Sequence, residues 1–97
     1  MAMDSLNIDC VVKLSRFYRF QYEQAQGCHV LLFPEGMIQL NGTASAILKL
    51  CDGKQTVAEI ICTLKQAYAE VTGLERDVIE FLQDASRQKW IIFGDKT

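Results

Sequence analysis

The chain has 97 residues, of which 49% are hydrophobic and 23% are charged, and its formal net charge is −2. This length allows one domain with a modest core. The slightly acidic balance argues against nucleic-acid binding, which usually requires a basic face. No segment approaches the roughly 18 apolar residues that a membrane-spanning helix needs.

The N-terminus lacks the features of an export signal, because no positive charge and no apolar stretch mark its first residues. We therefore expect a cytoplasmic protein with free thiols. None of the four cysteines forms a C-x-x-C pair, so the spacing of a metal site is absent. They are Cys10, Cys28, Cys51 and Cys62. Cys51 and Cys62 fall at apolar positions of helical patterns, and we expect both to be buried.

The first half of the chain shows the period of β-strands. Residues 1–16 have no sustained pattern and are predicted to be a flexible arm in front of the domain at 17–97. Residues 18–23 alternate aromatic and polar side chains, and residues 29–33 are apolar, so both predict strands. Pro34, Glu35 and Gly36 predict a hairpin loop with a glycine bulge, which returns as a strand at 37–40. The result is a three-stranded antiparallel meander.

The period changes to that of helices after Asn41, a candidate N-cap. A first helical face is followed by Gly53, placed to end the helix in the left-handed conformation. Thr56 and Glu59 form a capping-box signature for a second helix. The first apolar face consists of Ala44, Ile47, Leu48 and Cys51.

Thr72 and Glu75 repeat the capping signature before a third helix, whose apolar surface is wider than one stripe. Residues 90–93 are a last apolar run, predicted to be a short strand or a segment under the helices. Strands grouped before helices indicate an α+β domain. We predict a winged helix-turn-helix fold, with a three-stranded antiparallel sheet followed by three helices.

Catalytic residues are difficult to assemble from this sequence. The single histidine, His29, follows Cys28 along an extended segment, so their side chains point to opposite faces and cannot form a dyad. The acidic residues of the third helix fit a solvated face. The net charge of this helix, about −1 from Leu74 to Lys89, gives little electrostatic attraction for the phosphates of DNA. We therefore expect no enzyme, cofactor or metal site, and we disfavour binding to DNA.

A peptide-binding function uses features that these alternatives leave unexplained. The strand at 37–40 would lie at the edge of the sheet, where its unpaired amides and carbonyls could accept a peptide as an added strand. The surplus apolar surface of the third helix could form the opposite wall. Alternatively, the edge is covered by the N-terminal arm or by a second copy of the chain.

Several stretches between Phe17 and Trp90 resemble the pyrroloquinoline quinone biosynthesis protein D family. Each motif is weak alone, but their order and spacing together are specific. They are His29–Gly36, Leu40–Asn41, Ala46–Leu48, Cys51–Gly53, Thr56–Ile61, Asp77–Val78, Phe81–Leu82 and Lys89–Ile91.

The resemblance implies a winged-helix RiPP recognition element, where RiPPs are ribosomally made and later modified peptides. Such an element acts as a peptide chaperone, binding the precursor peptide and presenting it to a radical S-adenosylmethionine enzyme with iron–sulfur clusters. The metal and the cofactor belong to that enzyme. A winged-helix DNA-binding domain and a purely structural interaction domain are the alternatives.

The resemblance also implies a location for the peptide, between the third strand and the third helix. Carried over, it assigns peptide-binding roles to Met37, Ile38, Gln39, Leu40, Val78, Ile79, Leu82 and Ser86. Pro34, Glu35, Gly36, Asp52 and Gly53 are family hallmarks that we interpret as structural turns. For Glu35, contact with a partner is the alternative. Residues 1–16 lie outside the match and could be a loose arm, an extra strand or a fusion remnant, and an arm beside an open edge would permit a homodimer by strand exchange.

Overall fold

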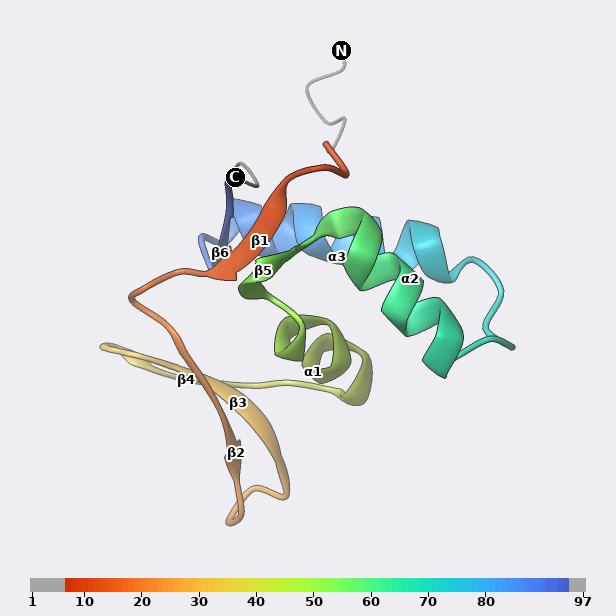
Figure 1. Cartoon of the computed structure of the whole chain (residues 1–97). Helices are drawn as coiled ribbons and strands as arrows, with labels where there is room; N and C mark the ends of the chain where they lie inside the picture. The colour runs from red at the N-terminus through yellow and green to blue at the C-terminus, as the bar shows by residue number, and fades with distance from the viewer. Residues whose placement is uncertain (1–6, 95–97) are drawn as a thin grey trace.

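The structure, a computed structural model, describes residues 7–94 of the chain and shows an α+β domain (Figure 1). Two antiparallel three-stranded sheets and three helices surround one core. In chain order the elements are β1 (Val11–Leu14), β2 (Arg19–Glu23), β3 (Cys28–Phe33), β4 (Gly36–Gln39), α1 (Gly42–Lys49), β5 (Asp52–Thr56), α2 (Val57–Ala67), α3 (Leu74–Arg87) and β6 (Ile91–Gly94). None of the helices in this described part is long and apolar enough to cross a membrane.

The predicted meander is confirmed as the sheet β2-β3-β4. Its second hairpin differs in detail, because Phe33 already pairs with Gly36 and leaves a loop of two residues, Pro34 and Glu35. Gly36 does not have positive φ. The expected glycine bulge is therefore wrong, since the pairing begins at Gly36 itself and leaves no extra residue to bulge.

A second sheet, with strand order β5-β1-β6, was not predicted. Its central strand, β1, lies inside the segment 1–16, for which a loose arm, an extra strand and a fusion remnant were the alternatives. For Val11–Leu14 the extra strand is confirmed and the flexible arm is wrong. Val12 is fully buried in the core, and the Ser15 amide donates to the Trp90 carbonyl at 2.7 Å. Residues 1–6 of the expected arm lie outside the described residues. The helices are thus not consecutive, because β5 separates α1 from α2 (Figure 1).

Gly53 has the positive φ expected of it, +81°, but it lies in β5 and does not end α1. Helix α1 ends at Leu50. Between the pairs Val11–Thr56 and Lys13–Asp52, β5 contains two more residues than β1. The Asp52 carboxylate holds this irregular turn by accepting the Lys54 amide at 2.8 Å, and this hydrogen bond lowers the pKa of Asp52.

Two of the three expected helix caps are present. Asn41 accepts the Ala44 amide at 2.7 Å, and Thr56 and Glu59 form the reciprocal capping box. The third capping box is wrong, because Gly73 takes the N-cap position of α3 with φ +75° and gives no side-chain cap. Thr72 lies one residue before this N-cap and so cannot act as the cap.

The core lies between the helices and the inner faces of both sheets. All four apolar residues predicted for the first helical face are buried. Burial raises the pKa of the Cys51 thiol to about 12, with the nearby Asp52 carboxylate adding to the shift. Cys62 is exposed, contrary to expectation, because it lies on the outer side of α2.

Candidate functional site

Strand β4 lies at the free edge of its sheet, with β3 on its other side. The Leu40 amide donates to the His29 carbonyl at 3.0 Å, which makes these two opposite residues a hydrogen-bonded pair. Hydrogen-bonded and non-hydrogen-bonded pairs alternate along an antiparallel ladder. The backbone N–H and C=O of Ile38 therefore point to β3, whereas those of Met37 and Gln39 point outward to the free edge.

The side chains of this segment alternate between the two faces of the sheet. Met37 is 41% exposed, and Gln39 is exposed, with its side-chain Nε2 donating to the Gln26 side-chain oxygen. Ile38 packs against the core, and Leu40 is buried in it. Of the residues at 37–40 assigned to the peptide, Met37 and Gln39 thus offer accessible backbone groups, while Ile38 and Leu40, the residue after β4, anchor the strand.

The α3 residues assigned to the opposite wall do not gather on one open surface. Val78 and Leu82 are fully buried, and Ile79 is half-buried against the core. Ser86 lines a different hollow, together with residues of β6. Their helical spacing could not distinguish a groove-facing side chain from a core side chain.

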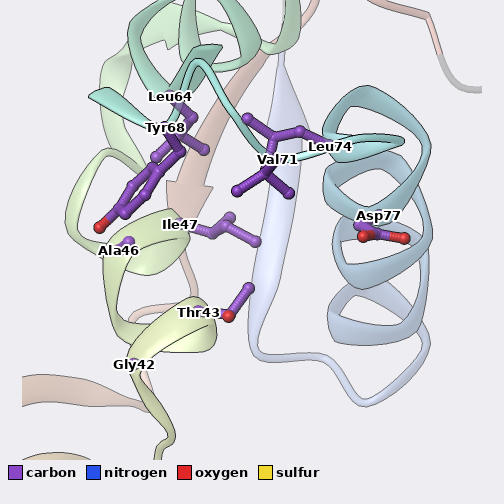
Figure 2. A pocket seen from close by; sticks show the side chains of 9 residues that line it. All are labelled: Gly42, Thr43, Ala46, Ile47, Leu64, Tyr68, Val71, Leu74 and Asp77. Atoms are coloured by element: carbon purple, nitrogen blue, oxygen red, sulfur yellow. The ribbon is translucent and has the colours of Figure 1, made fainter. Parts of the chain in front are cut away.

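An apolar cavity of about 350 Å³ opens near the end of β4, between α1, the end of α2 and the start of α3. Figure 2 shows Ile47, Val71 and Leu74 pointing into it from three different segments. Its mouth includes Tyr68 and Val71, both about half-exposed. The lining residues are Gly42, Thr43, Ala46, Ile47, Leu64, Tyr68, Val71, Leu74 and Asp77.

Two residues that line the cavity come soon after β4 in the chain. Gly42 and Thr43 line the cavity and follow Gln39 after only two residues, so the cavity lies near this end of β4. On α3, Asp77 is among the residues that line the cavity. Ile79, two positions later, lies on a different side of the helix.

Sequence reasoning missed this cavity. Tyr68 lies four residues after the buried Leu64 and so continues the apolar spacing of α2. Only the structure shows that Tyr68 is about half-exposed and lines the cavity. Val71 is a lone apolar residue in a loop, and Gly42 and Thr43 carry no pattern that points to a pocket.

The chemistry available here is that of binding. His29 stacks on the Phe20 ring at 4.8 Å and meets the Tyr22 ring edge-on at 5.1 Å, which gives it a packing role. Within residues 7–94, no group of three or more His, Cys, Asp or Glu side chains is placed to hold a metal ion. The site thus consists of backbone hydrogen-bonding groups beside an apolar cavity with one carboxylate at its rim.

Comparison with known proteins gives a consistent result. A family described as coenzyme PQQ synthesis protein D (PqqD) matches residues 28–91. Relatives named PqqA binding protein include one from Pseudomonas aeruginosa (strain UCBPP-PA14), 49% identical over 85 residues, covering 88% of this chain and 92% of the relative. Another, from Klebsiella pneumoniae, is 54% identical over 81 residues, covering 84% and 88%.

A solved structure is also similar. It is the solution NMR structure of the PqqD truncation of Methylobacterium extorquens PqqCD, described as a functional and stand-alone RiPP recognition element. The TM-score is 0.72 at 30% identity, and the match covers 95% of this chain and 99% of that one. The observed arrangement of sheets and helices is therefore that of a recognition element.

Proposed function

Because this chain belongs to the coenzyme PQQ synthesis protein D (PqqD) family, we propose that it binds the ribosomal precursor peptide PqqA and presents it to a radical S-adenosylmethionine enzyme. The names of its relatives support the first half, since they are PqqA binding proteins. They also agree with the expectation of a binding protein and not an enzyme. Presentation to the enzyme is the role that the family resemblance implies for recognition elements.

The observation that carries the proposal is the free edge of β4. Met37 and Gln39 direct their backbone groups outward, so an extended peptide can pair with them as an additional strand. Such pairing fixes the register of the peptide, because each outward N–H and C=O requires its own partner.

Selectivity would come from side-chain contacts beyond the strand. The cavity lined by Ile47, Val71 and Leu74 suits one apolar side chain of the peptide. The other assigned α3 positions, Val78 and Leu82, would support this wall from beneath. Held together by the recognition element, peptide and enzyme meet at a raised effective concentration, and this chain performs no chemistry itself.

The homodimer by strand exchange is a secondary proposal. The free edge of β4 suits a second copy of the chain as well as a peptide. In that case dimer and peptide would compete for the edge, and sedimentation velocity should show the dimer dissociating as PqqA is added.

The DNA-binding alternative gains no support from the structure. On α3, Arg76 pairs with Glu80 and Arg87 pairs with Asp84. Both cations are therefore already neutralised by neighbours, which leaves little attraction for phosphate.

The test is a calorimetric titration of the chain with synthetic PqqA, using a scrambled peptide as the control. We expect saturable binding near 10 µM or tighter, about −7 kcal/mol, for the PqqA peptide alone. Equal heats for both peptides, or none for either with unchanged NMR spectra, would contradict the proposal.

A further inference from the structure

Two large apolar side chains are exposed together, away from the cavity at the end of β4. Phe17 is 63% exposed and Ile92 is 52% exposed. Both line one hollow, of about 640 Å³, between the β1–β2 linker, the end of α3, and β6. Exposed apolar groups that share one hollow mark an interaction surface more often than single scattered ones do.

Positively charged side chains surround this apolar pair. The Arg16 guanidinium lies over the Phe17 ring, 5.2 Å from its centroid, and Lys89 lines the same hollow as Phe17. Arg19 lines an adjoining hollow that shares Phe17. We call Arg16, Phe17, Arg19, Lys89 and Ile92 the aromatic–basic patch.

The patch has no negative charge of its own. Among residues 7–94, neither hollow is lined by an Asp or a Glu. The ion pairs found within residues 7–94 involve Lys65, Arg76 and Arg87 as the cations, so Arg16, Arg19 and Lys89 have no acidic partner within that range. On a chain with a net charge of −2, this is a local excess of positive charge.

Lys89 stands where a glycine would fit the backbone better. It has φ +67° and follows the C-cap of α3, with the Lys89 amide donating to Ser86 and the Trp90 amide donating to Ala85. This is the Schellman arrangement, whose left-handed residue is usually glycine. A lysine in this conformation is strained, so its presence is not explained by the local fold.

We propose that the aromatic–basic patch docks an acidic protein surface that carries an exposed apolar side chain, and that this surface belongs to the modifying enzyme. The identity of the partner rests on the proposed function, whereas the chemistry of the patch does not. Complementary charge would orient the encounter, and burial of Phe17 and Ile92 would supply affinity. Three cations release few counterions, which makes nucleic acid a poorer occupant.

The experiment measures binding of the full chain to the purified radical S-adenosylmethionine enzyme under anaerobic conditions, by biolayer interferometry at two salt concentrations. The test variant is Arg16→Glu/Lys89→Glu. A matched control, Lys49→Glu/Lys54→Glu, reverses the same number of exposed charges outside the patch. Affinity for PqqA is measured for every variant in parallel.

We expect the test variant to bind the enzyme roughly tenfold more weakly or worse, and the control less than threefold more weakly. PqqA affinity should stay within twofold for both variants. Wild-type binding to the enzyme should weaken as salt rises. Lys89→Gly separates binding from folding, because it should raise the thermal unfolding midpoint while it weakens enzyme binding.

Other results would overturn the inference in distinguishable ways. Unchanged enzyme binding by the test variant, or an equal loss in the control, rejects the patch and leaves the proposed function standing. A parallel loss of PqqA affinity would assign the patch to the peptide site. Wild-type chain that binds PqqA but not the enzyme, or that binds phosphatidylglycerol vesicles in its place, rejects both the presentation step and this inference.

Discussion

The Leu40 amide donates to the His29 carbonyl at 3.0 Å, and this hydrogen bond determines which groups of β4 remain free. Because the ladder alternates, the next residue back, Gln39, directs its N–H and C=O away from β3. Met37 does the same one pair further along. The outward N–H and C=O groups of Met37 and Gln39 are thus available to an added strand.

Replacing Gln39 by proline tests this edge directly. Gln39→Pro removes an outward N–H that no neighbouring strand uses, so the unfolding free energy should fall by less than about 1 kcal/mol. PqqA affinity should fall about tenfold, because the peptide loses one hydrogen bond and meets the proline ring. Calorimetry and thermal melts measure the two effects.

Ile38→Pro is the matched control, since the Ile38 N–H points into the sheet. It should cost about 2 kcal/mol or more of stability. If Gln39→Pro proved as damaging as Ile38→Pro, the assignment of the outward groups would be wrong.

Filling the cavity should weaken peptide binding without unfolding the chain. Ala46 is half-buried in the cavity wall on α1, and Ala46→Phe would occupy space that we assign to a peptide side chain. We expect PqqA affinity to fall at least fivefold, about 1 kcal/mol, as measured by calorimetry. Ala67→Phe, at an exposed position outside the cavity, should leave that affinity unchanged. Equal affinities for wild type and Ala46→Phe would remove the cavity from the site.

Leu82 is fully buried, so its replacement should act on stability first. Leu82→Ala is expected to lower the unfolding free energy by 2–5 kcal/mol, measured by urea denaturation, through lost burial and a residual cavity. Leu82→Asp should prevent folding, because an unpaired charge would be buried. A folded Leu82→Asp variant with weakened PqqA binding would instead place Leu82 at the peptide surface.

The buried Cys51 thiol should give the chain a stability loss at alkaline pH. Its pKa is raised to about 12 by burial, from 9.0 in the unfolded chain. Between these values the unfolded state has released the proton and the folded state has not, so the unfolding free energy should fall by about 1.4 kcal/mol per pH unit above pH 9. Below pH 9 this group should add no slope.

Urea denaturation of wild type and Cys51→Ala between pH 7 and 11 isolates this effect from other titrating groups. The difference between the two unfolding free energies should be constant below pH 9 and should shrink above it. A difference that stays constant to pH 11 would show that Cys51 ionises normally in the folded state.

The sequence predicted those elements whose signals are local. Asn41 and the Thr56–Glu59 capping box each require only a few neighbouring residues to act, and both caps form. The hairpins of the meander likewise depend on alternation and on turn residues. The apolar face of α1 followed from helical spacing, because a single apolar stripe can face the core in only one way.

The second sheet could not be predicted in the same way. The Asp52–Lys54 part of β5 has no apolar side chain, and it forms a strand because β1 supplies the pairing, with Lys13 opposite Asp52, 39 residues later. Val11–Leu14 do contain three apolar residues, but four residues are too short for a periodicity to stand out. Both strands depend on contacts that are distant in sequence.

The candidate site was predicted in part for a related reason. The edge position of β4 follows from the strand order of the meander, and the turn residues between the strands predicted that order. The cavity combines α1, α2, α3 and the intervening loop, and Val71 acquires its role only when those elements meet. The wide apolar surface of α3 left open which side chains enter the core, and the structure places Val78 and Leu82 there.

The most direct test of the central claim is amide hydrogen exchange, measured by NMR on the labelled chain with and without saturating PqqA. Added-strand pairing predicts that the amides of Met37 and Gln39 exchange quickly in the free chain and become protected by at least tenfold in the complex. The Ile38 amide should be protected in both states. Saturated binding that leaves Met37 and Gln39 exchanging as before would show that the peptide does not pair with β4.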